Sequence, residues 1–228
     1  MLKAIIFDFN GVILDDEPLH FMAMREAVAD LGVDLSKEAY WRKYLPLDDR
    51  ECLEAVCRDH LIELTEKQRT RILGLKIASY HRQIQNRYPL FPGAANCIRE
   101  AAYRYPLALA SVARRDEIEN TLEATDLRQF FRIIVAAEDF NLGKPHPESF
   151  LLALKQLNDS GKESFPEIHP EECIVIEDSV GGVTGARAAG MRCLAVSNSY
   201  TPDKLQEADR VVSSLEEVTP EELEGLFP

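Results

Sequence analysis

The sequence contains no hydrophobic run long enough to cross a membrane. Its longest apolar stretches, residues 4–7 and 133–137, have the length of strands, whereas a membrane-spanning helix needs about 20 apolar residues. The N-terminal segment has no basic lead followed by a cleavage site, so we expect no secretory signal. These absences favour a globular protein that does not associate with membranes.

Cysteine is scarce, and its spacing shows no pairing. The 228 residues include five cysteines, an odd number, and no Cys-x-x-Cys pair. This pattern is typical of reduced thiols rather than of a disulfide framework. We therefore expect a cytoplasmic protein.

Basic residues are also fewer than acidic ones. The chain has 26 Lys and Arg residues against 39 Asp and Glu residues, which gives a net charge of −13. Nucleic acids and anionic membranes both require basic surfaces, so we expect neither as a partner. No long exposed apolar stripe is recognisable, which favours a monomer. The length suits one large domain or two small ones.

Six short apolar runs predict the strands of a parallel sheet. Most are apolar throughout, as expected for strands covered on both faces. Amphipathic helical segments lie between them, which is the pattern of βαβ units. We therefore predict an α/β fold with a Rossmann-like three-layer core. The runs are residues 4–7, 107–110, 133–136, 173–176, 193–196 and 210–212.

The spacing of the strands is interrupted once, after the first strand. Residues 16–89 contain no convincing strand and show helical patterns over 18–31, 48–60 and 66–85. We therefore predict a catalytic core formed by residues 1–15 and 90–228, with an inserted all-helical domain at 16–89 that could move as a lid.

Polar side chains follow the predicted strands at the points where the strands end. Asp8 follows the first strand and Ser111 the second. Lys144 lies in a Gly-Lys-Pro sequence after the third strand, and Glu177 and Asp178 follow the fourth. Ligands of open parallel sheets bind beyond the carboxyl ends of the strands. We therefore expect these side chains to meet at one edge of the sheet.

This set of groups suits phosphoryl transfer. Asp8 could attack phosphorus and form an aspartyl-phosphate. Asp8 and Asp178, with a backbone carbonyl near Asn10, offer the oxygen ligands that Mg²⁺ prefers. Lys144 would neutralise charge on the transferring group, and Ser111 would donate a hydrogen bond to it. The expected partner is a small phosphorylated metabolite.

Four ordered motifs carry a resemblance to a known family, the haloacid dehalogenase superfamily. The all-helical insert and Asp15 resemble the subgroup with a helical cap, which includes β-phosphoglucomutase and phosphoglycolate phosphatase. The motifs are Phe-Asp-x-x-Gly-Val at 7–12, Ala-Leu-Ala-Ser at 108–111, Gly-Lys-Pro-x-Pro at 143–147 and Ile-Glu-Asp-Ser at 176–179.

The resemblance implies a role for each matching residue. Asp8 is expected to be the nucleophile, Ser111 and Lys144 to bind phosphate, and Asp178 with Glu177 to form the magnesium site. The resemblance also implies a cap that closes over the substrate. Dehalogenation is not favoured, because the dehalogenases of the superfamily need no metal whereas this chain keeps the acidic pair.

Asn10 departs from the family pattern. Phosphatases of the family usually carry a second aspartate there, which protonates the leaving group and then activates water. An amide cannot transfer protons near neutral pH, so a rate contribution of about 10²–10⁴-fold would be missing. The chain is then a phosphate binder without turnover, a protein with an introduced substitution, or a slow phosphatase whose proton transfer uses Asp15, Asp16, Glu17 or His20.

Two residues of the insert are expected to contact the substrate. Relatives often place a substrate-facing lysine at the position of Lys76, and His20 lies near the start of the first insert helix. In mutase relatives an arginine of the second insert helix grips the distal phosphate. This chain has Asp49 at that position and Arg50 one step further, which argues against a mutase.

The sequence therefore predicts a magnesium-dependent phosphohydrolase of small phosphorylated metabolites such as sugar phosphates. Two alternatives stay open. One is a β-phosphoglucomutase-like phosphomutase, and the other is a catalytically impaired pseudophosphatase that binds phosphorylated metabolites.

Overall fold

The computed structural model describes residues 1–45, 47–84, 88–161 and 166–228. The chain forms two compact units. We call residues 1–15 with 88–228 the core unit and residues 16–87 the helical unit. Within the described ranges, every helix is too short or too polar to cross a membrane.

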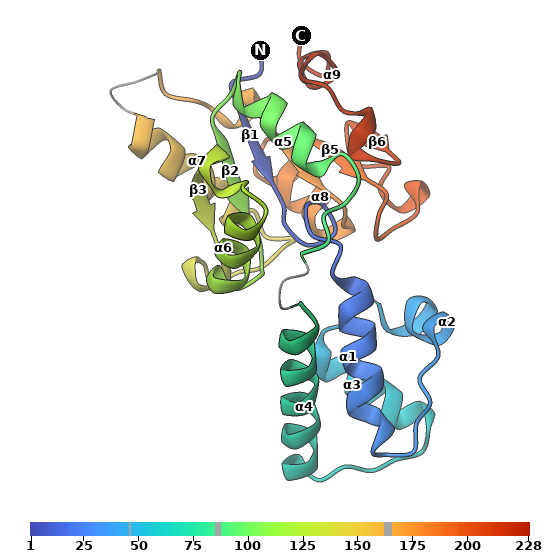
Figure 1. The fold of residues 1–228 in the computed structure, drawn as a ribbon. Helices are drawn as coiled ribbons and strands as arrows, with labels where there is room; N and C mark the ends of the chain where they lie inside the picture. Colours follow the sequence, from blue (N-terminus) through green and yellow to red (C-terminus); the bar gives the residue numbers. More distant parts are fainter. Residues whose placement is uncertain (46, 85–87, 162–165) are drawn as a thin grey trace. The chain divides into compact units, whose positions relative to one another are not determined.

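The core unit is built on a six-stranded sheet in which all neighbouring strands are parallel (Figure 1). The strand order is β3-β2-β1-β4-β5-β6. The chain runs outward from β1 to β3 on one side and from β4 to β6 on the other. The order therefore reverses between β1 and β4, and open α/β sheets bind ligands beyond the carboxyl ends of the strands at such a switch point. The strands are β1 (Ala4–Phe7), β2 (Leu107–Ala110), β3 (Phe131–Val135), β4 (Cys173–Glu177), β5 (Arg192–Val196) and β6 (Arg210–Val212).

The predicted α/β fold with a parallel sheet is confirmed, and three strands differ in extent from the prediction, β5 only in that it begins one residue earlier, at Arg192. β3 begins at Phe131, ahead of the predicted start at residue 133. The exposed Arg132 interrupts the apolar run there, and an edge strand tolerates such a residue because one side of it reaches water. β4 continues through Glu177, so this carboxylate is carried by the strand itself.

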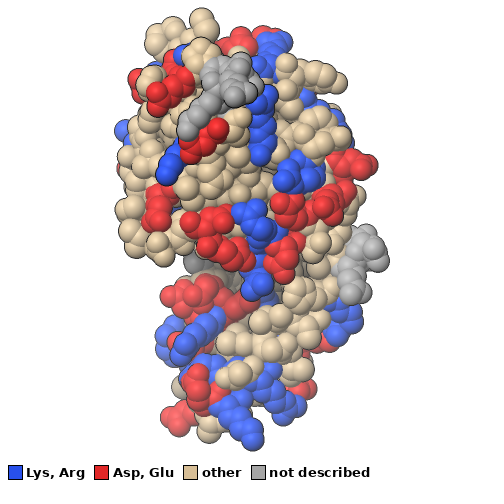
Figure 2. Space-filling model, turned by 90° about the vertical axis from the view of Figure 1, so that its left-hand side faces the viewer, with Lys and Arg blue, Asp and Glu red and all other residues tan. Residues whose placement is uncertain are grey.

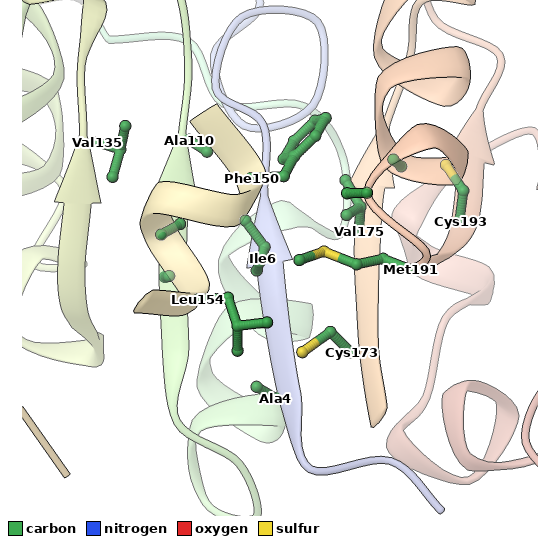
Figure 3. Packing of buried hydrophobic residues seen from close by; sticks show 14 of the residues in the cluster. Ala4, Ile6, Ala110, Val135, Phe150, Leu154, Cys173, Val175, Met191 and Cys193 are labelled. Carbon is green, nitrogen blue, oxygen red and sulfur yellow. The ribbon is translucent and has the colours of Figure 1, made fainter. Parts of the chain in front are cut away.

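Helices α7 (Glu148–Gly161) and α8 (Val180–Ala188) pack on one face of the sheet. Phe150 and Leu154 of α7 lie over Ile6 and Val175 (Figure 3). Alternate strand residues such as Ile5 point to the opposite face and are fully buried as well. Burial on both faces explains why the strands are apolar throughout.

Three further helices and five 3₁₀ turns complete the described part of the core unit. The helices are α5 (Ala94–Ala102), α6 (Arg115–Ala124) and α9 (Pro220–Glu224). The 3₁₀ turns are η2 (Arg128–Phe130), η3 (Ala137–Asp139), η4 (Pro170–Glu172), η5 (Pro202–Lys204) and η6 (Leu215–Glu217).

The helical unit has a hydrophobic core of its own, and its described residues include no strand. Helices α1 and α4 lie side by side in it (Figure 1). Asp48 and Glu51 form a capping box at the start of α3, with the Asp48 carboxylate accepting from the Glu51 backbone N–H. The elements are α1 (Glu17–Ala29), α2 (Lys37–Ala39), the π-helical turn η1 (Tyr40–Tyr44), α3 (Asp49–Asp59) and α4 (Glu66–Ile84).

The core unit holds the two ends of the insertion together by backbone hydrogen bonds. The Asp15 N–H donates to the Pro89 carbonyl at 2.8 Å, and the Phe91 N–H donates to the Ile13 carbonyl at 3.0 Å. The predicted end of the last insert helix, residue 85, lies outside the described residues. That the helical unit acts as a cap stays a prediction.

Charges of both signs are intermixed on the surface drawn in Figure 2. Several basic side chains are paired with acidic ones, as in the Lys3–Glu172 and Arg192–Asp209 ion pairs. The five cysteines are free and buried. The acidic excess is therefore distributed as solvated and paired side chains.

Candidate functional site

The carboxyl ends of β1 and β4 bring three acidic side chains together. Phe7 pairs with Ile176 in the sheet, so Asp8, one residue further, lies level with Glu177. The Asp8 N–H extends this pairing by donating to the Ile176 carbonyl at 2.9 Å. Asp8, Glu177 and Asp178 are all buried, and each offers an oxygen within 4.8 Å of the others. The cluster occupies the switch point of the sheet.

Lys144 joins the first two members of this cluster. It lies between η3 and α7, and its side chain is only 9% exposed. The Nζ atom donates to Asp8 Oδ1, and also to Glu177 Oε1 at 2.6 Å. Burial alone would lower the pKa of Lys144, but the two carboxylates raise it overall. Lys144 is therefore a fixed cation between two acids.

Glu177 is fully engaged by its neighbours. Its Oε2 accepts hydrogen bonds from the Asp178 N–H at 2.8 Å, and from the N–H and hydroxyl of Ser179, both at 2.9 Å. Burial opposes ionisation, but Lys144 and these donors lower the pKa of Glu177 overall. A Cβ atom on Gly182 would lie 1.8 Å from the Glu177 carboxyl carbon. Only glycine leaves room for the carboxylate at that position.

The other two carboxyl groups, Asp8 and Asp178, lie in surroundings that disfavour their ionised forms. Burial raises the pKa of Asp8 to about 7, against the attraction of Lys144. Burial and the charges of Glu177 and Asp8 raise the pKa of Asp178 well above its usual range. With all three carboxylates ionised, the single ammonium leaves two negative charges in excess. A divalent cation would balance them, and carboxylate oxygens suit Mg²⁺.

The turn that follows β1 packs directly on this cluster. Asn10 lies in this turn, and the Gly11 N–H donates to the Leu14 carbonyl at 3.1 Å. Gly11 has a φ of +79°, and a Cβ atom there would lie 2.0 Å from Asp178 Oδ2. The position therefore requires glycine both for its backbone conformation and for the close approach of Asp178.

Ser111 lies at the same edge of the sheet, directly after β2. Its side chain is almost completely buried, and its N–H donates to the Val135 carbonyl at 3.0 Å. Its hydroxyl oxygen accepts from the Ala113 N–H at 3.1 Å. The backbone thus fixes the position of the hydroxyl.

Two site residues were not identified from the sequence. Ser199 donates from its hydroxyl to Asp178 Oδ2. Asn198 donates from its amide nitrogen to the Gly11 carbonyl at 2.7 Å. Both follow β5, so the rule that polar residues after strands mark the site would have found them if it had been extended to the fifth strand.

The remaining predicted residues, His20 and Lys76, belong to the helical unit. The buried Lys76 Nζ lies 2.6 Å from His20 Nδ1 and 2.7 Å from Asp49 Oδ2. An ammonium group has only donors, so Nδ1 accepts and Nε2 carries the proton toward Asp16 Oδ2 at 3.2 Å. The structure therefore brings these two residues together, in a different unit from Asp8.

Asp49 and Arg50, the residues at and next to the position of the mutase arginine, each contact a side chain of opposite charge. Asp49 neutralises Lys76, whereas the exposed Arg50 is paired with Glu54 at 3.3 Å. The hydroxyl of Tyr80 donates to Asp16 at 2.7 Å. The cationic groups of this polar cluster are thus matched by carboxylates.

The chain is similar to characterised enzymes over nearly its whole length. It is 30% identical to the phosphorylated carbohydrates phosphatase of Thermotoga maritima, with 97% of this chain and 96% of that protein covered. A structure of CbbY from Rhodobacter sphaeroides, an aspartate-to-asparagine variant in complex with xylulose 1,5-bisphosphate, has a TM-score of 0.75 at 28% identity and covers 95% of this chain and 96% of CbbY.

A second solved structure, β-phosphoglucomutase from Clostridium difficile, has a TM-score of 0.76 at 25% identity. It covers 99% of this chain and 97% of that protein. Residues 2–190 match the family model of haloacid dehalogenase-like hydrolases. The family match includes the acidic cluster, Lys144 and the whole helical unit. The chain therefore belongs to the haloacid dehalogenase-like hydrolases.

Proposed function

We propose that the protein is a magnesium-dependent phosphatase of small phosphorylated metabolites such as sugar phosphates. The observation that carries this proposal is the buried Lys144 bridge between Asp8 and Glu177, with Asp178 beside it. A nucleophilic carboxylate, a cation that neutralises the transferring group, and carboxylates that can hold a metal are the parts that phosphoryl transfer uses. The names of the relatives, a phosphatase of phosphorylated carbohydrates and a CbbY that binds a sugar bisphosphate, support the same class of substrate.

Asp8 and Asp178 are the proposed side-chain ligands of the metal, with the Asn10 carbonyl as a third. Their oxygens fit a hard divalent cation, and the excess negative charge of the cluster favours one. Glu177 differs, because Lys144 and three other donors already occupy its two oxygens. We infer that Glu177 orients Lys144 and the Asp178 backbone. When bound, Mg²⁺ would supply positive charge to the phosphate oxygens.

The proposed reaction has two displacements. A carboxylate oxygen of Asp8 attacks phosphorus, the bond from phosphorus to the substrate oxygen breaks, and the alcohol leaves with the electron pair and takes up a proton. Lys144 neutralises charge on the transferring group. The Ser111 hydroxyl donates a hydrogen bond to a phosphate oxygen, since its own oxygen already accepts from the Ala113 N–H. Water then attacks phosphorus, the bond from phosphorus to the Asp8 oxygen breaks, and inorganic phosphate leaves while the Asp8 carboxylate is restored.

Asn10 limits this scheme, because its amide neither protonates the leaving group nor activates the water. Solvent water must therefore donate the proton to the leaving alcohol and accept the proton of the attacking water, without help from the Asn10 side chain. We therefore propose a slow phosphatase whose metal site is intact, since the Asn10 backbone carbonyl is independent of the side chain.

The test is phosphate release from a panel of sugar phosphates in the presence of Mg²⁺. Wild type should release phosphate slowly, and both chelation of the metal and Asp8→Asn should abolish the release. Acid quenching with a substrate labelled in the phosphoryl group should trap the label on Asp8. Unchanged turnover by Asp8→Asn would overturn the proposed mechanism.

The pseudophosphatase is a second candidate, and the asparagine at position 10 is the observation that favours it. Calorimetric binding of the same sugar phosphates distinguishes the two functions. Binding without phosphate release, in wild type and in Asn10→Asp alike, would establish a binding protein. Release by either form would establish an enzyme that turns over.

A further inference from the structure

The segment directly after β5 reaches across the sheet to two parts of the proposed metal site. The Ser197 N–H donates to the Val212 carbonyl at 2.9 Å, which ties the start of the segment to β6. The next two residues make contacts in the opposite direction. Asn198 contacts the turn after β1, and Ser199 contacts Asp178 after β4. One short segment therefore contacts both sides of the switch point.

We propose that Asn198 and Ser199 are positioning residues that hold the magnesium site in its binding geometry. The proposal rests on the metal site assigned under the proposed function and extends it to residues that never touch the metal. Partners of metal ligands fix the orientation of those ligands and strengthen binding.

Ser199 acts on one oxygen of the Asp178 carboxylate. Its hydroxyl donates to Oδ2, the same oxygen that faces the backbone of Gly11. Oδ2 therefore has a hydrogen-bond donor on one side and the close-packed Gly11 on the other, and turning the carboxylate about its last bond would lose the Ser199 hydrogen bond. Oδ1 is thereby presented as the oxygen available for a cation.

Asn198 acts on the opposite side, through the backbone of the turn after β1. Its amide donates to the Gly11 carbonyl at 2.7 Å, and Gly11 has the left-handed conformation. A glycine in such a turn exchanges conformations readily unless its peptide group is held. The Asn198 amide fixes the peptide that follows Gly11, and with it the adjoining Asn10 carbonyl that is the proposed third ligand.

Calorimetric titration with MgCl₂ tests the proposal without any turnover. Ser199→Ala should weaken magnesium binding by about 10- to 100-fold, and Asn198→Ala should weaken it in the same direction. Ser199→Thr should restore the affinity, because it keeps the hydroxyl. Ser197→Ala is the matched control, since the Ser197 hydroxyl bonds to the Val212 carbonyl at 3.2 Å, away from the site.

Two outcomes show whether the assigned metal site is wrong or only the positioning role of Asn198 and Ser199 is wrong. If Asp178→Asn binds magnesium as tightly as wild type does, the assigned metal site is wrong. If Asp178→Asn loses binding but Ser199→Ala keeps it, the metal site stands and the positioning role is overturned. Unfolding in metal-free buffer completes the test. A merely structural role would reduce stability there without changing magnesium affinity in the variants that still fold.

Discussion

At the scale of the residue, Asn10 offers the backbone carbonyl that an aspartate would offer, but not the proton transfer that an aspartate side chain would add. Its backbone carbonyl belongs to the turn that packs on Asp178, and any residue could supply that carbonyl. Its side chain cannot gain or lose a proton near neutral pH, as general acid–base catalysis requires. In the proposed mechanism, metal binding and proton transfer are therefore independent at this position, so a single substitution can test one without the other.

We predict that Asn10→Asp raises the rate of phosphate release by about 10²–10⁴-fold. The new carboxyl group would protonate the leaving alcohol and then activate water against the aspartyl-phosphate. The rate is measured with the best sugar phosphate of the panel at saturating Mg²⁺. The double variant Asp8→Asn, Asn10→Asp is the control and should stay inactive. An unchanged rate in Asn10→Asp would mean that another group already transfers the proton.

The candidate residues Asp8 and Asp178 were predictable because they come at the ends of apolar runs, and Lys144 because it lies in the Gly-Lys-Pro sequence of the loop after the third run. Asp8, Lys144 and Asp178 needed no knowledge of strand order, since all parallel strands present their carboxyl ends at one edge. Ser199 was not predictable in its role, because its contact with Asp178 depends on β5 lying beside β4. The sequence also could not distinguish Glu177 from its neighbour, because only the hydrogen bonds reveal that both of its oxygens are occupied.

At the scale of the element, strand positions were predictable and strand order was not. A strand buried on both faces is apolar throughout, so five of the six runs lay within a residue of the observed strands. β3 was the exception, because the exposed Arg132 belongs to an edge strand. The crossover that places β4 next to β1 has no local signal, since it depends on which long-range pairing buries most apolar surface.

The start of α8 provides a matched pair of variants for the next prediction. A Cβ atom at residue 182 would overlap the Glu177 carboxylate, whereas one at residue 181 meets its nearest atoms at an ordinary 3.8 Å. Gly182→Ala should therefore cost about 1–3 kcal/mol. Gly181→Ala should be neutral or stabilise the protein by up to about 1 kcal/mol.

Urea unfolding measures both effects on stability, and the rate of phosphate release shows the local consequence. Displacement of Glu177 should loosen Lys144, so Gly182→Ala should also impair phosphate release, while Gly181→Ala should not. Equal stability of the two variants would contradict the close packing of Glu177 under α8.

A pH dependence is expected from α1 of the helical unit. Burial raises the pKa of Glu17 above 4.5, although the Tyr40 hydroxyl, which donates to it at 2.7 Å, acts in the opposite direction. A carboxyl group with a raised pKa stabilises the fold below its unfolded pKa, and this contribution is lost as the pH rises through the folded pKa. Glu17→Gln, which resembles the protonated form, should therefore be more stable than wild type at neutral pH.

Urea unfolding of wild type and Glu17→Gln across the acidic to neutral range checks this sign. The advantage of the variant should shrink as the pH falls toward 4.5. Tyr40→Phe is the control, because it removes the donor and should destabilise wild type at neutral pH. A constant difference between wild type and Glu17→Gln at all pH values would show that Glu17 does not titrate abnormally.

At the scale of the whole molecule, the charge of the chain opposes its proposed substrate. The net charge of −13 repels phosphate esters at long range, while Lys144 and the proposed cation attract them only at short range. The range of the repulsion is set by salt, with a Debye length of about 30 Å at 0.01 M and about 8 Å at 0.15 M.

We predict that kcat/KM for p-nitrophenyl phosphate rises between these two ionic strengths at saturating Mg²⁺. Electrostatically steered enzymes show the opposite sign, because salt screens an attraction in their case. Exchanging one monovalent salt for another at equal ionic strength controls for specific ion effects. A fall of kcat/KM with added salt would show that the local positive field dominates the approach of the substrate.

The strand order also determines when the reactive centre can exist during synthesis. β1 and Asp8 leave the ribosome first, but β4, which begins at Cys173, is made late and inserts directly beside β1. A nascent chain that stops short of this point has one long edge of β1 unpaired and lacks both Glu177 and Asp178. Such a chain is exposed to edge-to-edge association, and its Asp8 lacks the two acidic partners with which it clusters in the folded protein. Under the proposed mechanism, the metal site beside Asp8 therefore stays incomplete until translation has passed β4.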